Sequence, residues 1–162
     1  MNEYSLRIGI GRDLHRLVEE RRFLIGGVHI PFNKGEAGHS DGDVLCHALI
    51  DAMLGASGLG DVGELFPPSS PQWKDANSLD LLAIANKKLK DAGWQIINID
   101  SVIECEAPKI LPYRNEIRAS IAAALGIDLE RVFIKGKTAE ALGDIGSGNA
   151  VAANVVCLLT KN

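Results

Sequence analysis

Strand-like and helix-like segments are interspersed along the chain, and their order limits the folds that it can adopt. Apolar patterns typical of strands cover residues 5–10, 22–30, 96–105, 131–137 and 150–159, the second of them a hairpin around Gly26-Gly27. Apolar positions with helical spacing cover residues 41–57, 78–93 and 112–126. Because strands and helices do not alternate strictly, we expect an α+β fold with a mostly single-faced sheet covered by helices.

The start of the first predicted helix has a sequence signal of its own. Ser40-x-x-Asp43 has the spacing of a capping box, with Asp in place of the commoner Glu, directly before an apolar run. This spacing predicts that Ser40 caps a helix over about 41–57.

The length of the chain suits one domain. Its 162 residues contain no repeat, linker or low-complexity segment, so we expect a single domain over residues 1–162. Hydrophobic residues make up 46% of the chain and glycine adds 17 residues. This apolar share exceeds that of typical globular chains, about 45–50% with glycine included, and favours a buried interface between subunits.

Charge and cysteine content exclude several classes of function. A net charge of -4, with no run of five or more like charges, argues against binding to nucleic acid or to an anionic membrane. Cys46, Cys105 and Cys157 are odd in number and form no Cys-x-x-Cys pair, which favours buried thiols in a reducing compartment. No basic-then-apolar leader and no long apolar run is present, so we expect a cytoplasmic protein without a membrane span.

An acidic stretch with two histidines is the first candidate for chemistry. From residue 35 to residue 73 there is no Lys or Arg, yet six carboxylates and two histidines are present: Glu36, His39, Asp41, Asp43, His47, Asp51, Asp61 and Glu64. A cation other than a nearby side chain is needed to balance this charge. Asp43, His47 and Asp51 have the spacing of one helix face, which would also fit a solvated surface.

A second fragment, Asp13-Leu14-His15, makes a metal site the sharper hypothesis. At the end of the first predicted strand, positions 13 and 15 point to one side of the extended chain. Together with His47 they offer two imidazoles and one carboxylate, a three-ligand set typical of catalytic zinc with an open position. Cys46 faces another direction on the helix and is expected to be a core thiol.

The segment from Lys135 to Glu140 offers two lysines, a hydroxyl and a carboxylate after a strand. This combination suits an anion with a divalent metal, although an exposed strand end with surface lysines would look the same. The Pro- and Ser-rich residues 66–77 are expected to form a lid over a site.

Several motifs, in order and with matching spacing, carry a resemblance to a known family. They are Gly9-Ile10-Gly11-Arg12-Asp13-Leu14-His15, Ile25-Gly26-Gly27-Val28-x-Ile30-Pro31, His39-Ser40-Asp41-Gly42-Asp43-Val44-x-x-His47, Leu59-Gly60-Asp61-Val62-Gly63-x-x-Phe66-Pro67, Ala107-Pro108-Lys109-x-Leu111-Pro112 and Lys135-x-x-Thr138-x-Glu140-x-Leu142-Gly143. By these motifs the chain resembles the 2-C-methyl-D-erythritol 2,4-cyclodiphosphate synthase family of the non-mevalonate isoprenoid pathway.

The resemblance implies a role for each matching residue. Zinc would be held by Asp13, His15 and His47, and a second divalent ion, Mg²⁺ or Mn²⁺, by Glu140. The residues that would contact the nucleotide substrate include three of these metal ligands. They are Asp13, His15, His39, Ser40, Asp61, Gly63, Phe66, Ala107, Pro108, Lys109, Leu111, Lys137, Thr138 and Glu140. Of these, His39 and Thr138 would be catalytic by stabilising the transition state. The family's site is shared between adjacent subunits, so the resemblance also implies a homotrimer.

The resemblance also implies the reaction. The family converts 4-diphosphocytidyl-2-C-methyl-D-erythritol 2-phosphate to the cyclic diphosphate and CMP. The 2-phosphate of the substrate is itself the nucleophile, so no serine, cysteine or general base of the protein is required.

The chain departs from the family pattern at several positions. Ile10 stands where many members have histidine, and Pro68-Ser69-Ser70 replaces an acidic part of the lid. Asp144, Ser147 and Asn149 replace residues that often line a cavity on the trimer axis. The missing arginine there argues against binding of an isoprenoid diphosphate in that cavity.

Two other functions would use similar residues. A zinc phosphoesterase with a metal-activated water needs much the same ligands, and its product would be a linear phosphate. A non-catalytic trimeric module that binds metal or nucleotide would hold the ligand without turnover.

Overall fold

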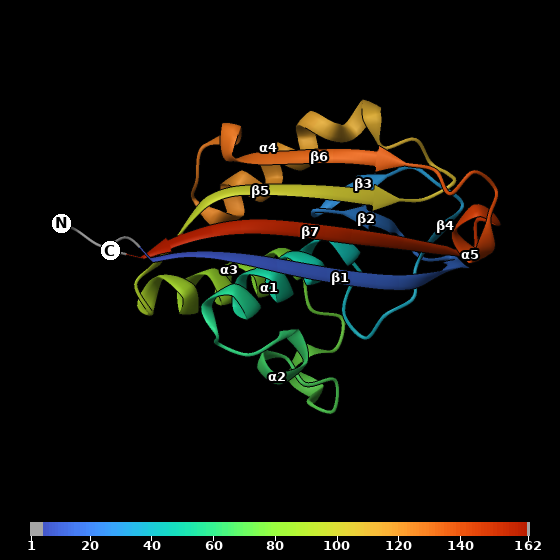
Figure 1. The fold of residues 1–162 in the computed structure, drawn as a ribbon. Coiled ribbons are helices and arrows are strands. Elements are labelled where there is room, and N and C mark those ends of the chain that lie inside the picture. The colour runs from blue at the N-terminus through green and yellow to red at the C-terminus, as the bar shows by residue number, and fades with distance from the viewer. Residues whose placement is uncertain (1–4, 162) are drawn as a thin grey trace.

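The computed structural model describes residues 5–161, which form one α+β domain around a five-stranded sheet (Figure 1). The strand order is β4-β1-β7-β5-β6, and the bounds are Lys34–Glu36, Ser5–Glu19, Ala150–Lys161, Trp94–Glu104 and Val132–Lys137. Only the β5 and β6 pair is parallel, since β1 pairs antiparallel with both β4 and β7, and β7 antiparallel with β5. The predicted fold class is confirmed.

The longer helices lie on one face of the sheet, behind the strands in Figure 1. They are α1 (Val44–Ser57), α3 (Ser78–Asp91) and α4 (Arg114–Leu125). A separate hairpin of β2 (Phe23–Ile25) and β3 (Val28–Ile30) turns at Gly26-Gly27, as predicted. The remaining elements are short: α2 (Val62–Leu65), α5 (Gly143–Gly146) and 3-10 turns at Pro71–Trp73, Leu111–Tyr113 and Leu129–Arg131.

Two glycines let α1 lie directly on β1. A Cβ atom on Gly11 would lie 1.8 Å from the carbonyl oxygen of Ala48, and one on Gly9 would lie 1.9 Å from that of Ala52. No side chain fits at such distances, so glycine is required at both positions. The close packing brings the N-terminal half of α1 beside the middle of β1.

The first strand is longer than predicted. It continues through Asp13 and His15 to Glu19, and it pairs with β7 as far as Arg16 opposite Ala150. The polar residues after Ile10 hid this continuation because they interrupt the apolar pattern, while pairing with β7 holds them in the sheet. The candidate ligands Asp13 and His15 therefore lie within a strand, where their positions are better defined than at a strand end.

The predicted start of α1 was wrong. Asp43, rather than Ser40, is the N-cap, and its carboxylate accepts hydrogen bonds from the backbone N–H groups of Leu45 and Cys46, both at 3.1 Å. Gly42, with φ at +88°, breaks the helical path that a cap at Ser40 would need. Asp43 is fully buried, so it does not belong to the polar helix face predicted for Asp43, His47 and Asp51.

The other face of the sheet is open. In the part of the chain that the structure describes, no helix covers it (Figure 1). Alternate residues of β1 point to this side, and Ile8 and Ile10 are 75% and 76% exposed. Leu6, Leu14, Phe133 and Val156 are also exposed large apolar residues of these strands. Among the described residues, no helix is long and apolar enough to cross a membrane.

Candidate functional site

Two strand residues and one helix residue form the centre of the candidate site. The Asp13 Oδ2 atom lies 3.1 Å from His15 Nε2 and 3.0 Å from His47 Nδ1. Asp13 and His15 project from the same side of β1, as the two-residue period of a strand predicts. His47 reaches them from α1 because Gly11 allows the helix to approach the strand.

The hydrogen bonds of the two imidazoles orient them. His15 Nδ1 lies 2.6 Å from the carbonyl oxygen of Gly42. A carbonyl only accepts, so Nδ1 donates and Nε2 is the ring atom left to face Asp13 and a metal ion. The Nε2 atom of His47 instead lies 3.0 Å from Ser40 Oγ and 3.1 Å from Ser78 Oγ, which leaves its Nδ1 atom facing Asp13.

The electrostatics of the cluster favour a charged carboxylate. Burial opposes ionisation of Asp13, but the hydrogen bonds and charges of His15 and His47 outweigh it and hold the pKa of Asp13 well below its usual range. Burial also opposes charge on His15, and Asp13 outweighs that effect, so the pKa of His15 is raised. Asp13 is therefore the anion that a cation at this place would pair with.

The donor set fits a zinc ion. The candidate ligand atoms of Asp13, His15 and His47 all lie within 4.8 Å of one another. Ligands about 2.0–2.1 Å from a tetrahedral zinc are roughly 3.3–3.4 Å apart, close to the observed separations from Asp13. With three protein ligands, a fourth position would remain for a substrate oxygen.

A cleft of about 250 Å³ opens beside this cluster. It is lined by Asp13, His15, His39, Ser40, His47, Val62, Gly63, Phe66, Pro68, Trp73 and Leu81. Phe66 and Trp73 pack edge to face with ring centroids 5.0 Å apart. Residues of the predicted lid segment thus form one wall of the cleft. Asp61 is not among the lining residues, since it caps α2 by accepting a hydrogen bond from the Glu64 N–H at 2.8 Å.

A second cleft, of about 280 Å³, lies between the end of β6 and the segment after β5. Its lining includes most of the predicted nucleotide-contacting residues in this region, namely Pro108, Lys109, Leu111, Lys137 and Thr138. Ala107 adjoins this segment but does not line the cleft. The Thr138 hydroxyl donates a hydrogen bond to Glu140 Oε1 at 2.8 Å, so these two predicted residues are brought together.

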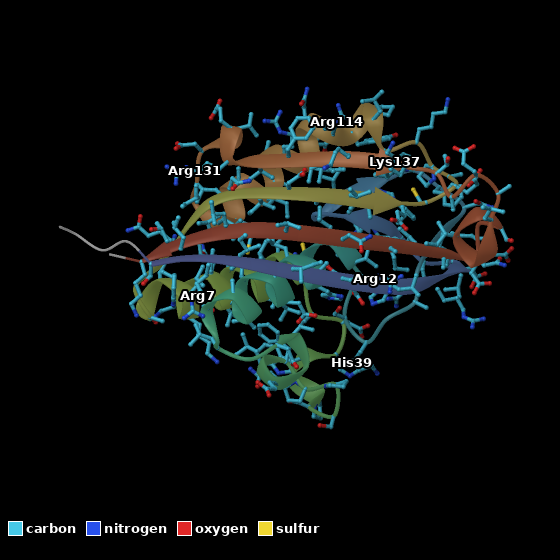
Figure 2. All side chains as sticks on the ribbon, viewed as in Figure 1. Arg7, Arg12, His39, Arg114, Arg131 and Lys137 are labelled. Carbon is cyan, nitrogen blue, oxygen red and sulfur yellow. The ribbon has the colours of Figure 1, made fainter. Side chains whose placement is uncertain are left out.

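The two clefts are separate within one chain. Figure 2 shows the labelled side chains of His39 and Lys137 on opposite sides of β1 and β7 in that view. Within residues 5–161, Glu140 does not belong to the cluster of Asp13, His15 and His47. One chain therefore contains two candidate half-sites, the first cleft with the cluster of Asp13, His15 and His47 and the second cleft, that do not meet.

Some residues around the site were not predicted from the sequence. The Ser78 hydroxyl contacts both Asp41 and His47 although it is 31 residues from His47 along the chain. Leu81 lines the first cleft and Arg114 lines the second. The signal for Ser78 was its position at the start of a helix directly after the predicted lid, but that signal does not specify a histidine as partner.

Ile10 lies away from the first cleft. Its side chain projects from the open face of the sheet, opposite to that of Asp13, because odd and even positions of β1 face different sides. The replacement of histidine by isoleucine at this position therefore leaves the metal cluster of this chain unchanged.

A fully buried glutamate supports the loop that carries His39 and Ser40. Glu36 Oε2 accepts a hydrogen bond from the Leu24 N–H at 3.0 Å, and its Oε1 atom has no partner among the described residues. Burial, together with the nearby Asp43 carboxylate, raises the pKa of Glu36 to about 8. Arg21 donates to the backbone oxygens of Glu36 and Ser40, both at 3.1 Å, and so clamps the two ends of this loop.

Comparisons with known proteins agree on one family. Residues 6–160 match the model of the YgbB family. A Treponema denticola protein named 2-C-methyl-D-erythritol 2,4-cyclodiphosphate synthase is 59% identical over 154 residues, which cover 95% of this chain and 96% of that protein.

Solved structures give the same result. The bifunctional IspDF of Campylobacter jejuni superposes with a TM-score of 0.95 at 39% identity over 99% of this chain, which spans 43% of that longer protein. IspF of Plasmodium falciparum in complex with CDP superposes with a TM-score of 0.86 at 35% identity, covering 98% of this chain and 97% of that one.

Proposed function

The chain belongs to the YgbB family, and on this premise we propose how its two clefts carry out the reaction of its relatives. It is a 2-C-methyl-D-erythritol 2,4-cyclodiphosphate synthase, a cyclising lyase of isoprenoid biosynthesis. It converts 4-diphosphocytidyl-2-C-methyl-D-erythritol 2-phosphate to 2-C-methyl-D-erythritol 2,4-cyclodiphosphate and CMP. The observation that carries the proposed site is the convergence of Asp13, His15 and His47 at the cleft.

The chemistry requires positioning and charge rather than a nucleophile from the protein. An oxygen of the substrate's 2-phosphate forms a bond to the β-phosphorus, while the bond from that phosphorus to CMP breaks and CMP leaves with the electron pair. Both reacting groups belong to one molecule, so the protein accelerates the step by holding them in line. Exclusion of water from the cleft then favours ring closure over hydrolysis.

We assign Asp13, His15 and His47 as the ligands of zinc, because their donor set and spacing fit that ion. When bound by these residues, zinc would supply positive charge that stabilises the substrate's diphosphate. Glu140 is proposed to help hold a second divalent cation, Mg²⁺ or Mn²⁺, since a lone carboxylate beside phosphates suits an ion that retains most of its waters.

The remaining side chains hold the substrate. We propose that His39 and Ser40, which line the first cleft, and Thr138 and Lys137, which line the second, contact phosphate oxygens. Gly63, with Asp61 beside it, is proposed to hold the erythritol hydroxyls, and Phe66 closes that side of the cleft. The 107–111 segment is proposed to surround the cytosine, which agrees with the CDP bound by the Plasmodium falciparum relative.

A homotrimer would bring the two half-sites together. The clefts do not meet within one chain, so a complete site needs the first cleft of one subunit and the second cleft of its neighbour. The open sheet face, with Ile8 and Ile10 exposed, supports this proposal because burying its apolar residues would stabilise an assembly. We propose this face as the contact between subunits.

Analysis of the products by phosphorus NMR tests the proposed function. Incubation of the protein with the substrate, zinc and Mg²⁺ should give the cyclic diphosphate and CMP. A linear phosphate product would instead identify a zinc phosphoesterase, and binding of CDP without turnover would identify a non-catalytic module.

A further inference from the structure

We propose that Asp41 and Ser78 act as a pair of positioning residues that fix the proton and the orientation of the His47 imidazole. The proposal deepens the proposed function, since it rests on His47 as a metal ligand. Neither residue lines the cleft, and both act through His47, which does. Their effect should be on metal affinity.

The hydrogen bonds of Ser78 run in one direction only. Its hydroxyl donates to Asp41 Oδ1, and its backbone N–H donates to Asp41 Oδ2 at 2.9 Å. A carboxylate accepts but cannot donate, so the single hydroxyl proton of Ser78 is committed to Asp41. The Ser78 oxygen can then only accept from His47 Nε2, which lies 3.1 Å away.

This direction decides the tautomer of His47. With a proton held on Nε2, the imidazole can offer its Nδ1 lone pair to a metal ion. This Nδ1 atom lies 3.0 Å from Asp13 Oδ2 and belongs to the candidate metal cluster. Outer hydrogen bonds that fix the ring and tautomer of a ligating histidine are a general feature of metal sites. Here the Asp41 carboxylate acts on His47 through the Ser78 hydroxyl.

Ser40 cannot fix the tautomer by itself. Its Oγ atom lies 3.0 Å from His47 Nε2, but its proton has no committed acceptor among the described side chains. Because Ser78 requires a proton on His47 Nε2, the Ser40 oxygen also accepts from that N–H group. Ser40 can then direct its own hydroxyl proton toward the cleft that it lines. The pair thus also prepares Ser40 to donate to a substrate phosphate.

The pair joins the metal ligand to the base of the lid segment. Ser78 is fully buried and is the first residue of α3, directly after residues 66–77. Two backbone hydrogen bonds connect the same segments, from Asp75 N–H to the His39 oxygen at 2.9 Å and from Asp41 N–H to the Ala76 oxygen at 3.1 Å. The N-cap of α3 is Asn77, whose side chain accepts from the Leu79 N–H, while Asp41 accepts from the Ser78 N–H at the same helix end.

Zinc affinity, measured by competition with a chelator on the full-length protein, tests the pair. Ser78→Ala and Asp41→Asn should each weaken zinc binding roughly 10–100-fold, the usual effect of losing an outer partner of a metal ligand. Ser101→Ala is the matched control, because Ser101 is equally buried and its hydroxyl donates to the Phe133 oxygen, away from His47. Its zinc affinity should equal that of the wild type.

A double-mutant cycle separates positioning from a structural effect of Asp41. If Asp41 acts through Ser78, Asp41→Asn should change zinc affinity less than about twofold in the Ser78→Ala background, because coupled residues are not additive. Thermal unfolding of each variant provides the check on folding.

The outcomes are distinct. The proposed pair would be overturned if both single variants bound zinc with wild-type affinity. It would also be overturned if Asp41→Asn weakened zinc binding equally in the wild-type and Ser78→Ala backgrounds. Either result would leave the zinc site itself in place. A wild-type protein that binds no zinc would instead overturn the ligand assignment of the proposed function.

Discussion

Asp13 Oδ2 and His47 Nδ1 lie 3.0 Å apart although 34 residues separate them along the chain. The contact exists because Gly9 and Gly11 in β1 lack side chains, so that α1 packs against the strand backbone. The metal cluster is therefore a direct consequence of helix packing on the sheet.

The first prediction concerns this packing. Gly11→Ala places a methyl group against the Ala48 carbonyl and should destabilise the protein by at least about 1–3 kcal/mol, the usual effect of overpacking. Gly55→Ala is the matched control within α1, because its added methyl group meets no atom within 4 Å. It should stabilise the protein by roughly 0.5–1 kcal/mol. Urea unfolding measures both, and equal stability of the two variants would contradict the packing argument.

The second prediction uses the buried Glu36. Its pKa rises from 4.5 in the unfolded chain to about 8 in the native protein. Between these values the unfolded chain has lost the proton that the native protein retains, so this residue makes stability fall as pH rises from about 4.5 to about 8. The total effect is on the order of a few kcal/mol.

Glu36→Gln should remove that loss of stability. The free energy of unfolding of Glu36→Gln minus that of the wild type should therefore increase from pH 5 to pH 8, as measured by urea unfolding. Glu130→Gln, at an exposed glutamate, is the control and should show no such trend. A constant difference between Glu36→Gln and wild type across this range would show that Glu36 ionises normally.

The sequence predicted the fold class, the hairpin, the later helices and the pairing of Asp13 with His15, because each depends on local periodicity. Local patterns were less reliable where tertiary structure decides. Pairing with β7 extends β1 beyond Ile10, and the backbone at Gly42 moves the cap of α1 from Ser40 to Asp43.

Contacts between distant segments could not be read from spacing. The sequence predicted that His47 shares a metal site with Asp13 and His15, because a second imidazole completes a three-ligand set. The family resemblance supported this prediction. Nothing local relates Ser78 to Asp41 or His47, since their contacts form only when α3 packs beside the 39–43 loop.

The third prediction separates the two metal roles. Glu140→Gln should keep its zinc and weaken the response of turnover to added Mg²⁺, because the second ion loses its protein carboxylate but keeps the phosphates. Asp13→Asn should instead lower zinc occupancy. Bound zinc is measured by mass spectrometry and Mg²⁺ is titrated against rate. A Glu140→Gln protein that loses zinc but keeps the wild-type Mg²⁺ curve would reverse this assignment.

The fourth prediction concerns assembly. A charge on the open sheet face, as in Ile8→Asp, should shift the protein from about three times the 17.3 kDa chain mass toward the monomer in light scattering, with loss of activity. Ile84→Asp is the control, because Ile84 is an exposed apolar residue of α3 away from that face. A fully active wild-type monomer would rule out a site shared between subunits.

The rate of cyclisation by His47→Ala, followed by phosphorus NMR with bound zinc quantified, tests the assigned metal site most directly. His47 belongs to a preformed helix, so the variant should fold, lose zinc and cyclise the substrate at least about 100-fold more slowly, equivalent to roughly 3 kcal/mol of barrier. A variant that retains more than about a tenth of the wild-type rate would contradict the assignment of Asp13, His15 and His47 as the metal site that the reaction requires.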